Sequence, residues 1–245
     1  TGDSLTVPAS AAFAPGTGDF TVEGWYYSTA ASGNQQIWAQ TVSGLDYFNV
    51  IFIPGTSQFK FIGNSVEIVS TAIATPNRWN HFAVVRVGTA LTIYCNGTGN
   101  NPTTMSTNFS NTTYVPTISG YTHSATLMLT GYLSNLRYVN GTAVYTGNFT
   151  VPTSPLQATQ SSGTNIAAIT GSSTSLLTCQ SNRLNDNSLY NFTVTKVGDT
   201  TVSPFIPFSA PTTTTVNNVY STYFGGTDGR LTVPAGAAFA YGTGD

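Results

Sequence analysis

FAVVRVGTALTIYC, residues 82–95, contains two runs of β-branched and aromatic residues on either side of Gly88-Thr89. Such residues are enriched in strands, and a glycine at the first central position suits a two-residue type II′ turn. The stretch therefore predicts a β-hairpin. Its second strand ends at Asn96-Gly97, which is a further turn signal.

Short segments of the same character continue along the chain. We expect strands at residues 20–27, 58–62, 126–129, 133–139 and 191–197, with Gly, Pro, Asn and Ser between them. Apolar residues do not recur at helical spacing over three turns, so we expect almost no helix. Many short strands with frequent turns predict a β-sandwich or barrel.

The composition limits the partners. The chain has 245 residues, of which 40% are hydrophobic and 7% charged, enough for one large sandwich domain. An ordinary domain carries about 25% charged residues, so Thr, Ser, Asn and Gly must supply the polar surface here. Lys and Arg number seven against nine Asp and Glu, and no apolar run approaches the ~20 residues of a membrane span. We expect neither nucleic-acid binding nor membrane insertion.

The beginning of the sequence returns at its end. TGDSLTVPASAAFAPGTGD at residues 1–19 reappears as TDGRLTVPAGAAFAYGTGD at residues 227–245, with 14 of 19 positions identical. This indicates a tandem repeat in a longer protein. The expected plan is a sandwich over residues 1–203, a Pro/Thr-rich connector over 204–218 and the start of the next repeat over 219–245.

Residues 219–224, VYSTYF, precede the second copy and are predicted to form a strand. The counterpart of this strand lies ahead of Thr1, so the first repeat is expected to need another strand at that edge. An unpaired edge promotes aggregation. We therefore expect residues 219–224 to fill the position, either within this chain or by strand addition from a neighbouring repeat or subunit.

Three sequence blocks carry a family resemblance. The first block, within residues 5–25, comprises LTVP (5–8), Phe13 and GTGDFTVEGW (16–25). The second is WNHFAVVR at 79–86, and the third is LTIYCNG at 91–97. Their order and spacing resemble the laminin-G-like, concanavalin A-like jelly roll. The resemblance implies an all-β fold, a two-sheet antiparallel jelly-roll sandwich. It also implies carbohydrate or protein-surface recognition, often with bound Ca²⁺.

Later blocks of the sequence indicate which form of this family the chain resembles. GYLSNLRYVNGTAVY at residues 131–145, FTVP at 149–152 and LLTCQ at 176–180 are similar to the form found in structural proteins of tailed phages, especially marine ones. This implies a non-catalytic structural or adhesive repeat of a virion appendage, such as a tail fibre, located outside the cell or on the virion surface. The implied partners are neighbouring repeats or subunits of the same protein and host-surface glycans.

Two other functions account for fewer features of the sequence. A repeat from a secreted bacterial surface adhesin would share the low charge and the tandem plan. A glycan-active enzyme would need paired carboxylates, and the Glu-x-Asp-x-x-Glu run of hydrolases with this fold is absent. Asp19 and Glu23 form the nearest pair, for which a turn acid and a solvated strand residue are the simpler interpretation. We predict no enzyme and no catalytic residues.

The tryptophans are candidates for packing or for stacking on a sugar. Trp25 and Trp79 lie in or near predicted strands, and core packing is the better interpretation. Trp38 lies in the more polar stretch QQIWAQ at residues 35–40. For Trp38, a core position and an exposed stacking surface are equally good interpretations, so we include it among the candidate ligand-binding residues.

The other candidate ligand-binding residues are Asn135, Arg137 and Tyr138, which lie together in a predicted strand. An arginine in the middle of a strand of so uncharged a chain needs a carboxylate or carbonyl partner.

Ca²⁺ is the metal for which the sequence offers candidate ligands. The two histidines, His81 and His123, are too few for a three-histidine zinc site. Ca²⁺ needs only oxygen ligands from the backbone, Asn and one or two Asp. Asp3, Asp19 and Asp186 are the candidates, and each also fits an Asx turn.

The sequence is compatible with a disulfide and with glycosylation but requires neither. Cys95 and Cys179 fit either a disulfide or two small buried hydrophobic residues. Six Asn-x-Ser/Thr sequons are glycosylation sites only if the protein passes through a eukaryotic secretory route: Asn96, Asn108, Asn111, Asn140, Asn148 and Asn191.

Overall fold

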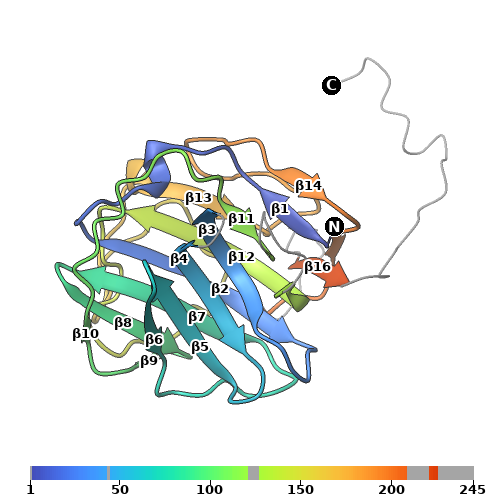
Figure 1. Ribbon diagram of the computed structural model, residues 1–245, viewed down its shortest axis with the longest axis horizontal. Coiled ribbons are helices and arrows are strands. Elements are labelled where there is room, and N and C mark those ends of the chain that lie inside the picture. Colours follow the sequence, from blue (N-terminus) through green and yellow to red (C-terminus); the bar gives the residue numbers. More distant parts are fainter. Residues whose placement is uncertain (1, 43–44, 121–126, 209–220, 226–245) are drawn as a thin grey trace.

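The computed structural model describes residues 2–42, 45–120, 127–208 and 221–225 (Figure 1). These residues form two antiparallel β-sheets and two short 3-10 helices, η1 (Ala11–Phe13) and η2 (Gly171–Ser173). Figure 1 shows two layers of strands, with β8 and β10 at one end of the view and β14 and β16 at the other. The predicted all-β, two-sheet jelly-roll sandwich is confirmed.

The first sheet has the order β14-β1-β11-β3-β4-β5-β6. Its strands are β1 (Ser4–Thr6), β3 (Gln35–Val42), β4 (Leu45–Ile53), β5 (Gln58–Gly63), β6 (Val66–Val69), β11 (Thr117–Ile118) and β14 (Thr195–Val197). The second sheet follows β10-β8-β7-β2-β12-β16-β15, with β9 beside β8 and β13 beside β12. Its strands are β2 (Phe20–Ser28), β7 (Asn80–Val87), β8 (Ala90–Cys95), β9 (Thr98–Gly99), β10 (Thr103–Thr104), β12 (Thr130–Asn140), β13 (Thr174–Thr178), β15 (Thr201–Ser203) and β16 (Ser221–Gly225).

The predicted hairpin at residues 82–95 is present as β7 and β8. Val87 pairs with Ala90 across the turn, and Gly88 has a φ of 58°, which an L side chain rarely adopts. The prediction of a strand at residues 126–129 was wrong for residues 127–129, the part that the structure describes. Leu127 has a φ of 71°, and this left-handed backbone interrupts the extended run so that β12 begins at Thr130.

Aromatic rings fill the space between the sheets. Successive side chains of a strand point to opposite faces, so Phe20 and Val22 of β2 enter the main core. Phe48 and Phe61 meet edge to face, with ring centroids 4.9 Å apart. Cys95 and Cys179 are both buried in this core and are not joined to each other in a disulfide.

A β-bulge in β12 changes which residues face outward. Ser134 pairs with Trp25 and Arg137 with Glu23, so two residues of β12 lie opposite Gly24. Asn135 has a φ of 55°, and a side chain at Gly24 would press on the Asn135 carbonyl oxygen. Leu133 and Leu136 therefore both enter the core, while Arg137 turns to the outer face.

The chain after β15 stays attached to the sandwich. Phe205 and Phe208 pack against aromatic residues of the second sheet. β16 pairs with Thr130–Leu133 of β12 on one side and with β15 on the other, so the strand predicted at residues 219–224 forms over Ser221–Gly225 within this chain. Residues 209–218 of the predicted connector, together with residues 219–220 and 226–245 of the expected next repeat, lie outside the described residues.

Candidate functional site

The outer face of the second sheet is covered by later parts of the chain. Residues 141–170, here called the covering loop, contain isolated bridges but no strand. Val144, Tyr145 and Ile169 of this loop pack on outward residues such as Val85 and Tyr94. The covering loop therefore occupies surface that the sheet would otherwise expose to solvent.

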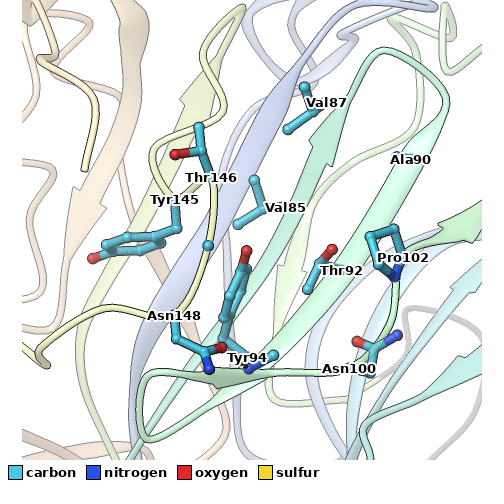
Figure 2. Close-up of a pocket in the computed structure, with 12 residues that line it drawn as sticks. Val85, Val87, Ala90, Thr92, Tyr94, Asn100, Pro102, Tyr145, Thr146 and Asn148 are labelled. Carbon is cyan, nitrogen blue, oxygen red and sulfur yellow. Dashed lines mark hydrogen bonds between the residues drawn. The ribbon is translucent and has the colours of Figure 1, made fainter. Parts of the chain in front are cut away.

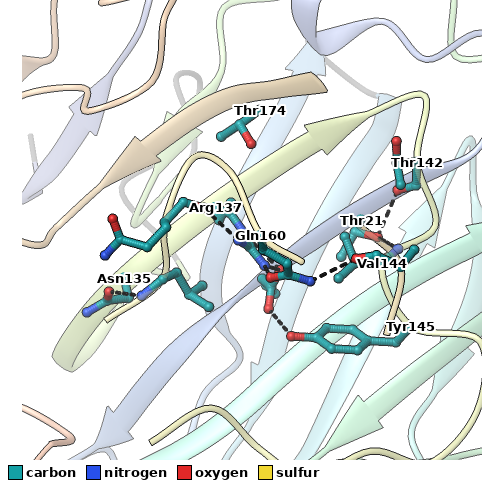
Figure 3. Close-up of polar contacts among 12 residues, drawn as sticks. Thr21, Asn135, Arg137, Thr142, Val144, Tyr145, Gln160 and Thr174 are labelled. Carbon is teal, nitrogen blue, oxygen red and sulfur yellow. Dashed lines mark hydrogen bonds and ion pairs between the residues drawn. The ribbon is translucent and has the colours of Figure 1, made fainter. Parts of the chain in front are cut away.

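Glu23 lies at the centre of a polar network beneath the covering loop. Figure 3 labels Arg137 and Tyr145 of this network. Arg137 donates to Glu23 Oε1 from Nε at 2.9 Å and from Nη2 at 2.6 Å. The Tyr145 hydroxyl donates to Glu23 Oε2 at 2.6 Å. His81 Nε2 lies 3.3 Å from the same oxygen and must be the donor, because a carboxylate only accepts. All four side chains are at most 1% exposed.

The same arginine holds the covering loop in place. Arg137 donates from Nη1 to the Gln157 carbonyl at 2.7 Å and from Nη2 to Gln160 Oε1 at 2.9 Å. Nearby, Thr21 Oγ1 accepts from the Val144 amide at 2.8 Å (Figure 3). Buried polar groups are costly unless they are paired, so these bonds tie the loop to β2 and β12.

The network keeps Glu23 ionised. Burial raises the pKa of this carboxyl, but the Arg137 charge and the hydrogen bonds from His81 and Tyr145 outweigh burial and lower the pKa to about 2. A carboxylate that is fully covered and paired cannot reach a substrate. Asp19, the other acid considered for catalysis, accepts a hydrogen bond from the Gly88 amide at 2.7 Å and caps the β7–β8 turn.

An open groove lies beside the covering loop, on the outer face of β7 and β8 (Figure 2). Its volume is about 300 Å³, at the lower end of the ~300–1,000 Å³ of small-molecule sites. Figure 2 shows Tyr145, Thr146 and Asn148 along one side and Asn100 and Pro102 along the other. The floor between them comes from alternate outward residues of the hairpin: Val85, Val87, Ala90, Thr92 and Tyr94.

The groove combines an apolar floor with uncharged polar groups. Tyr94 is held by Phe149, with ring centroids 5.3 Å apart. Burial raises the pKa of the Tyr94 hydroxyl, so it stays protonated and can donate; a hydrogen bond with Thr92 acts in the opposite direction. The exposed Asn148 accepts from the Gly99 amide at 3.0 Å through Oδ1. Hydroxyl and amide groups over an apolar floor suit a neutral, hydroxyl-rich ligand.

The four predicted ligand-binding residues are all buried. Trp38, Asn135, Arg137 and Tyr138 are each 0% exposed. Trp38 and Tyr138 lie in the core between the sheets, with ring centroids 5.3 Å apart. Because none of the four reaches the surface, we correct their assignment from ligand binding to packing and internal bonding.

Asn135 and Arg137 nevertheless support the site from beneath. Asn135 Oδ1 accepts from the Leu156 amide at 2.9 Å and from Gln180 Nε2 at 2.6 Å. The carboxylate partner expected for Arg137 is present and is Glu23. These two residues therefore position the covering loop and do not contact a ligand.

The three candidate Ca²⁺ ligands lie in different parts of the fold. Asp186 Oδ1 accepts from the Leu177 and Ser188 amides, and its Oδ2 from Ser188 Oγ and the Phe192 amide. Asp3 accepts from the Asp199 amide at 2.7 Å. Among the described residues no cluster of three or more His, Cys, Asp or Glu is arranged to hold a metal ion.

Sequence reasoning missed the groove residues Thr92, Tyr94, Asn100 and Asn148. The alternation of the hairpin already indicated that Thr92 and Tyr94 share one face. Nothing local indicated that the covering loop would bring Asn148 beside them, because that contact joins segments about fifty residues apart. Within the described residues, no helix has the length and apolar character to span a membrane.

Comparison with known proteins agrees with this geometry. A laminin-G-type profile described as the concanavalin A-like lectin/glucanases superfamily matches residues 1–143. No curated protein sequence matches the chain significantly.

Several solved structures are similar to this chain at low identity. A candidate carbohydrate-binding protein from Bacteroides ovatus is 13% identical with a TM-score of 0.54, over 80% of this chain and 56% of that chain. Domain 4 of an extracellular arabinanase from Geobacillus stearothermophilus, in complex with arabinotriose, is 14% identical with a TM-score of 0.44, over 57% of this chain and 68% of that one. Domains LG4-5 of mouse laminin alpha1 are 14% identical with a TM-score of 0.40, over 60% of this chain and 44% of that one. Since the profile matches more than half of its residues, this chain belongs to the concanavalin A-like lectin/glucanases superfamily.

Proposed function

We propose that this chain is a non-catalytic recognition module that binds neutral glycans in the groove between the covering loop and residues 99–102. The observation that carries the proposal is the groove itself, with an apolar floor from Val85 and Tyr94 and uncharged polar groups along its sides. Carbohydrates present both apolar ring faces and hydroxyls, so such a surface complements them. The superfamily membership and the candidate carbohydrate-binding protein with the same fold support this assignment.

The absence of catalysis is part of the proposal. Glycoside hydrolysis uses two carboxyl groups that flank the scissile bond. Glu23 is 0% exposed and paired with Arg137, and the groove lining contains no carboxylate. The module therefore holds a glycan without cleaving it, and incubation with the bound glycan should release no reducing sugar above a buffer control.

Binding should first be sought on a glycan array and then measured by titration calorimetry with the full chain. Tyr94→Phe removes one hydroxyl from the groove and keeps the ring. Loss of one net hydrogen bond of about 1 kcal/mol predicts about fivefold weaker binding. Tyr190→Phe, an exposed tyrosine outside the groove, is the matched control and should bind as the original chain does.

Two results would contradict the glycan proposal. One is an array without hits. The other is a hit whose affinity is equal in the Tyr94→Phe and Tyr190→Phe variants and in a Val87→Lys variant, which places a long charged side chain at the groove. Because the groove lining carries no charge, binding should change little between low and high salt.

We further propose that the module is a repeated unit of an extracellular virion appendage, such as a phage tail fibre. The sequence repeat at residues 1–19 and 227–245 and the low charge support this role. The test is the position of the full-length gene: neighbouring tail and baseplate genes are expected. A neighbourhood of bacterial secretion and cell-wall genes would instead identify a surface adhesin.

A further inference from the structure

Three aromatic side chains form a cradle on the outer face of the second sheet, away from the groove. Tyr27 and Tyr132 are register partners on β2 and β12, and Trp79 directly precedes β7. Trp79 lies 5.9 Å from Tyr27 and 6.3 Å from Tyr132, measured between ring centroids. Each of the three is only partly buried. We call Tyr27, Trp79 and Tyr132 the aromatic cradle.

The ring of Phe205 sits in this cradle. Its centroid lies 4.9 Å from Tyr27, 4.9 Å from Tyr132 and 5.3 Å from Trp79. Phe205 belongs to Pro-Phe-Ile-Pro-Phe, residues 204–208, and Phe208 of the same segment packs on Trp25 at 4.9 Å. Even in this position Phe205 is 40% exposed, so the cradle is shallow and open to solvent on one side.

One polar atom of the cradle has no partner among the described residues. Trp79 Nε1 is buried, and none of the acceptors in that part of the chain lies within hydrogen-bond distance of it. An indole N–H that is buried usually finds an acceptor, and leaving it unpaired is costly. The hydrocarbon ring of Phe205 cannot supply one. A ring that carried a hydroxyl oxygen would fill the same space and also accept this hydrogen bond.

We propose that the aromatic cradle is a second glycan-binding site, specific for the face of a neutral pyranose ring, and that Phe205 is its internal competitor. The inference rests on the proposed function, since it assumes that the module recognises glycans. In this arrangement the sugar ring stacks on Trp79 and one of its oxygens accepts the Nε1 hydrogen. The segment at residues 204–208 must swing away for the sugar to enter.

An internal competitor lowers the apparent affinity by the fraction of molecules in which the site is open. If the cradle is open in about one molecule in ten, removal of the Phe205 ring should tighten binding about tenfold. Phe205→Ala tests this directly. Tyr190→Ala removes another exposed aromatic ring and serves as the matched control.

The probes are cellotetraose, chitotetraose and mannotetraose, titrated into the ¹⁵N-labelled full chain. The readout is the indole N–H resonance of Trp79, identified by its absence in Trp79→Phe. With Phe205→Ala, at least one sugar should shift this resonance at about tenfold lower concentration than in the original chain. With Tyr190→Ala, the dependence should be unchanged. Trp79→Phe combined with Phe205→Ala keeps a ring but loses the donor and its resonance, so its affinity is measured by titration calorimetry beside that of Phe205→Ala, and the gain in affinity should disappear.

The results separate the two proposals. If a sugar binds the original chain through Tyr94 but Phe205→Ala neither tightens binding nor moves the Trp79 resonance, the cradle proposal is overturned and the groove stands. If none of the three sugars binds any variant, the cradle proposal fails, and the glycan array decides the groove proposal separately. If Phe205→Ala does not fold, Phe205→Leu is used instead, because it keeps an apolar contact while opening part of the cradle. If none of the sugars then shifts the Trp79 resonance, the inference is overturned.

Discussion

Glu23 and Arg137 are the residues on which the outer face of the second sheet depends. Both are 0% exposed, and Arg137 links the carboxylate of β2 to two residues of the covering loop. Two opposite charges that are fully shielded from solvent are stable only as a pair, because each alone would be an uncompensated buried charge. Their role is to hold the loop, which in turn forms one side of the groove.

Glu23→Gln should therefore be strongly destabilising. It keeps the size of the side chain but leaves the Arg137 charge without its counter-ion, which predicts a loss of about 3–5 kcal/mol in the free energy of unfolding. Urea titration followed by tryptophan fluorescence measures this. Glu67→Gln breaks the Lys60–Glu67 pair, in which the Glu67 side chain is exposed to solvent, and should cost about 0–1 kcal/mol. Equal effects of the two substitutions would contradict the role given to Glu23.

The same carboxylate predicts a pH dependence. Its pKa is about 2 in the folded protein against an ordinary value of 4.5, so the unfolded chain takes up a proton first as the pH falls. The stability contributed by Glu23 should be complete above pH 4.5 and should disappear progressively between pH 4.5 and 2, by about 3 kcal/mol in all. Urea titrations across this range should show that loss in the original chain. A Glu23→Gln variant that lost stability just as steeply would rule Glu23 out as the cause.

At the scale of elements, turns fix where the covering loop can dock. Asn96 and Gly97 join β8 to β9 with φ angles of 50° and 79°. The Gly97 carbonyl accepts from the Phe149 amide at 3.1 Å, so the backbone of the covering loop lies directly on this turn. A glycine suits this position for two reasons. It adopts a positive φ without strain, and its lack of a side chain lets the backbone of the covering loop approach closely.

Gly97→Ala and Gly88→Ala separate these two demands. Both glycines have positive φ, and an alanine there costs about 1–2 kcal/mol. At Gly88 the added methyl group would meet nothing, whereas at Gly97 it would overlap the Phe149 carbonyl oxygen. We expect Gly97→Ala to cost a further ~1–3 kcal/mol and to weaken glycan binding through the displaced loop. Thermal unfolding measures the first effect, and equal losses at the two positions would argue against loop docking on this turn.

At the scale of the whole molecule, the sandwich is completed by a strand from far along the sequence. β16 lies between β12 and β15 in the second sheet. Without it, the backbone groups of Thr130–Leu133 in β12 would form an open edge, and this chain has few charged residues to protect such an edge from other molecules.

A chain that ends at Phe208 lacks β16 and should be less stable. Loss of the ladder to β12 and β15 predicts a decrease of about 2–4 kcal/mol, counting about 1 kcal/mol for each net hydrogen bond. It should also associate with itself as concentration rises, which size-exclusion chromatography detects. A chain that ends at Gly225 keeps the strand and is the control. Monomeric behaviour and full stability in both would show that β16 is dispensable.

Local chemistry determined much of this protein from the sequence alone. The hairpin at residues 82–95 follows from β-branched runs around Gly88-Thr89, and the two-sheet core follows from alternation along strands such as β2. These features depend on neighbours in sequence, and a period of two is visible without any tertiary information.

The outer face of the second sheet was decided by tertiary structure. Alternation counted from Leu133 puts Arg137 in the core, and only the bulge at Asn135 turns it toward Glu23. For Trp38, the polar neighbours left a core position and an exposed surface equally good, and the structure buries Gln36 and Gln40 with it. Gln36 Nε2 donates to the Trp38 carbonyl at 2.6 Å, and Gln40 Oε1 accepts from Trp38 Nε1 at 3.3 Å. The groove needs Asn148 beside Tyr94. Such contacts join segments that are distant in sequence, and their free energy exists only once the chain has brought them together.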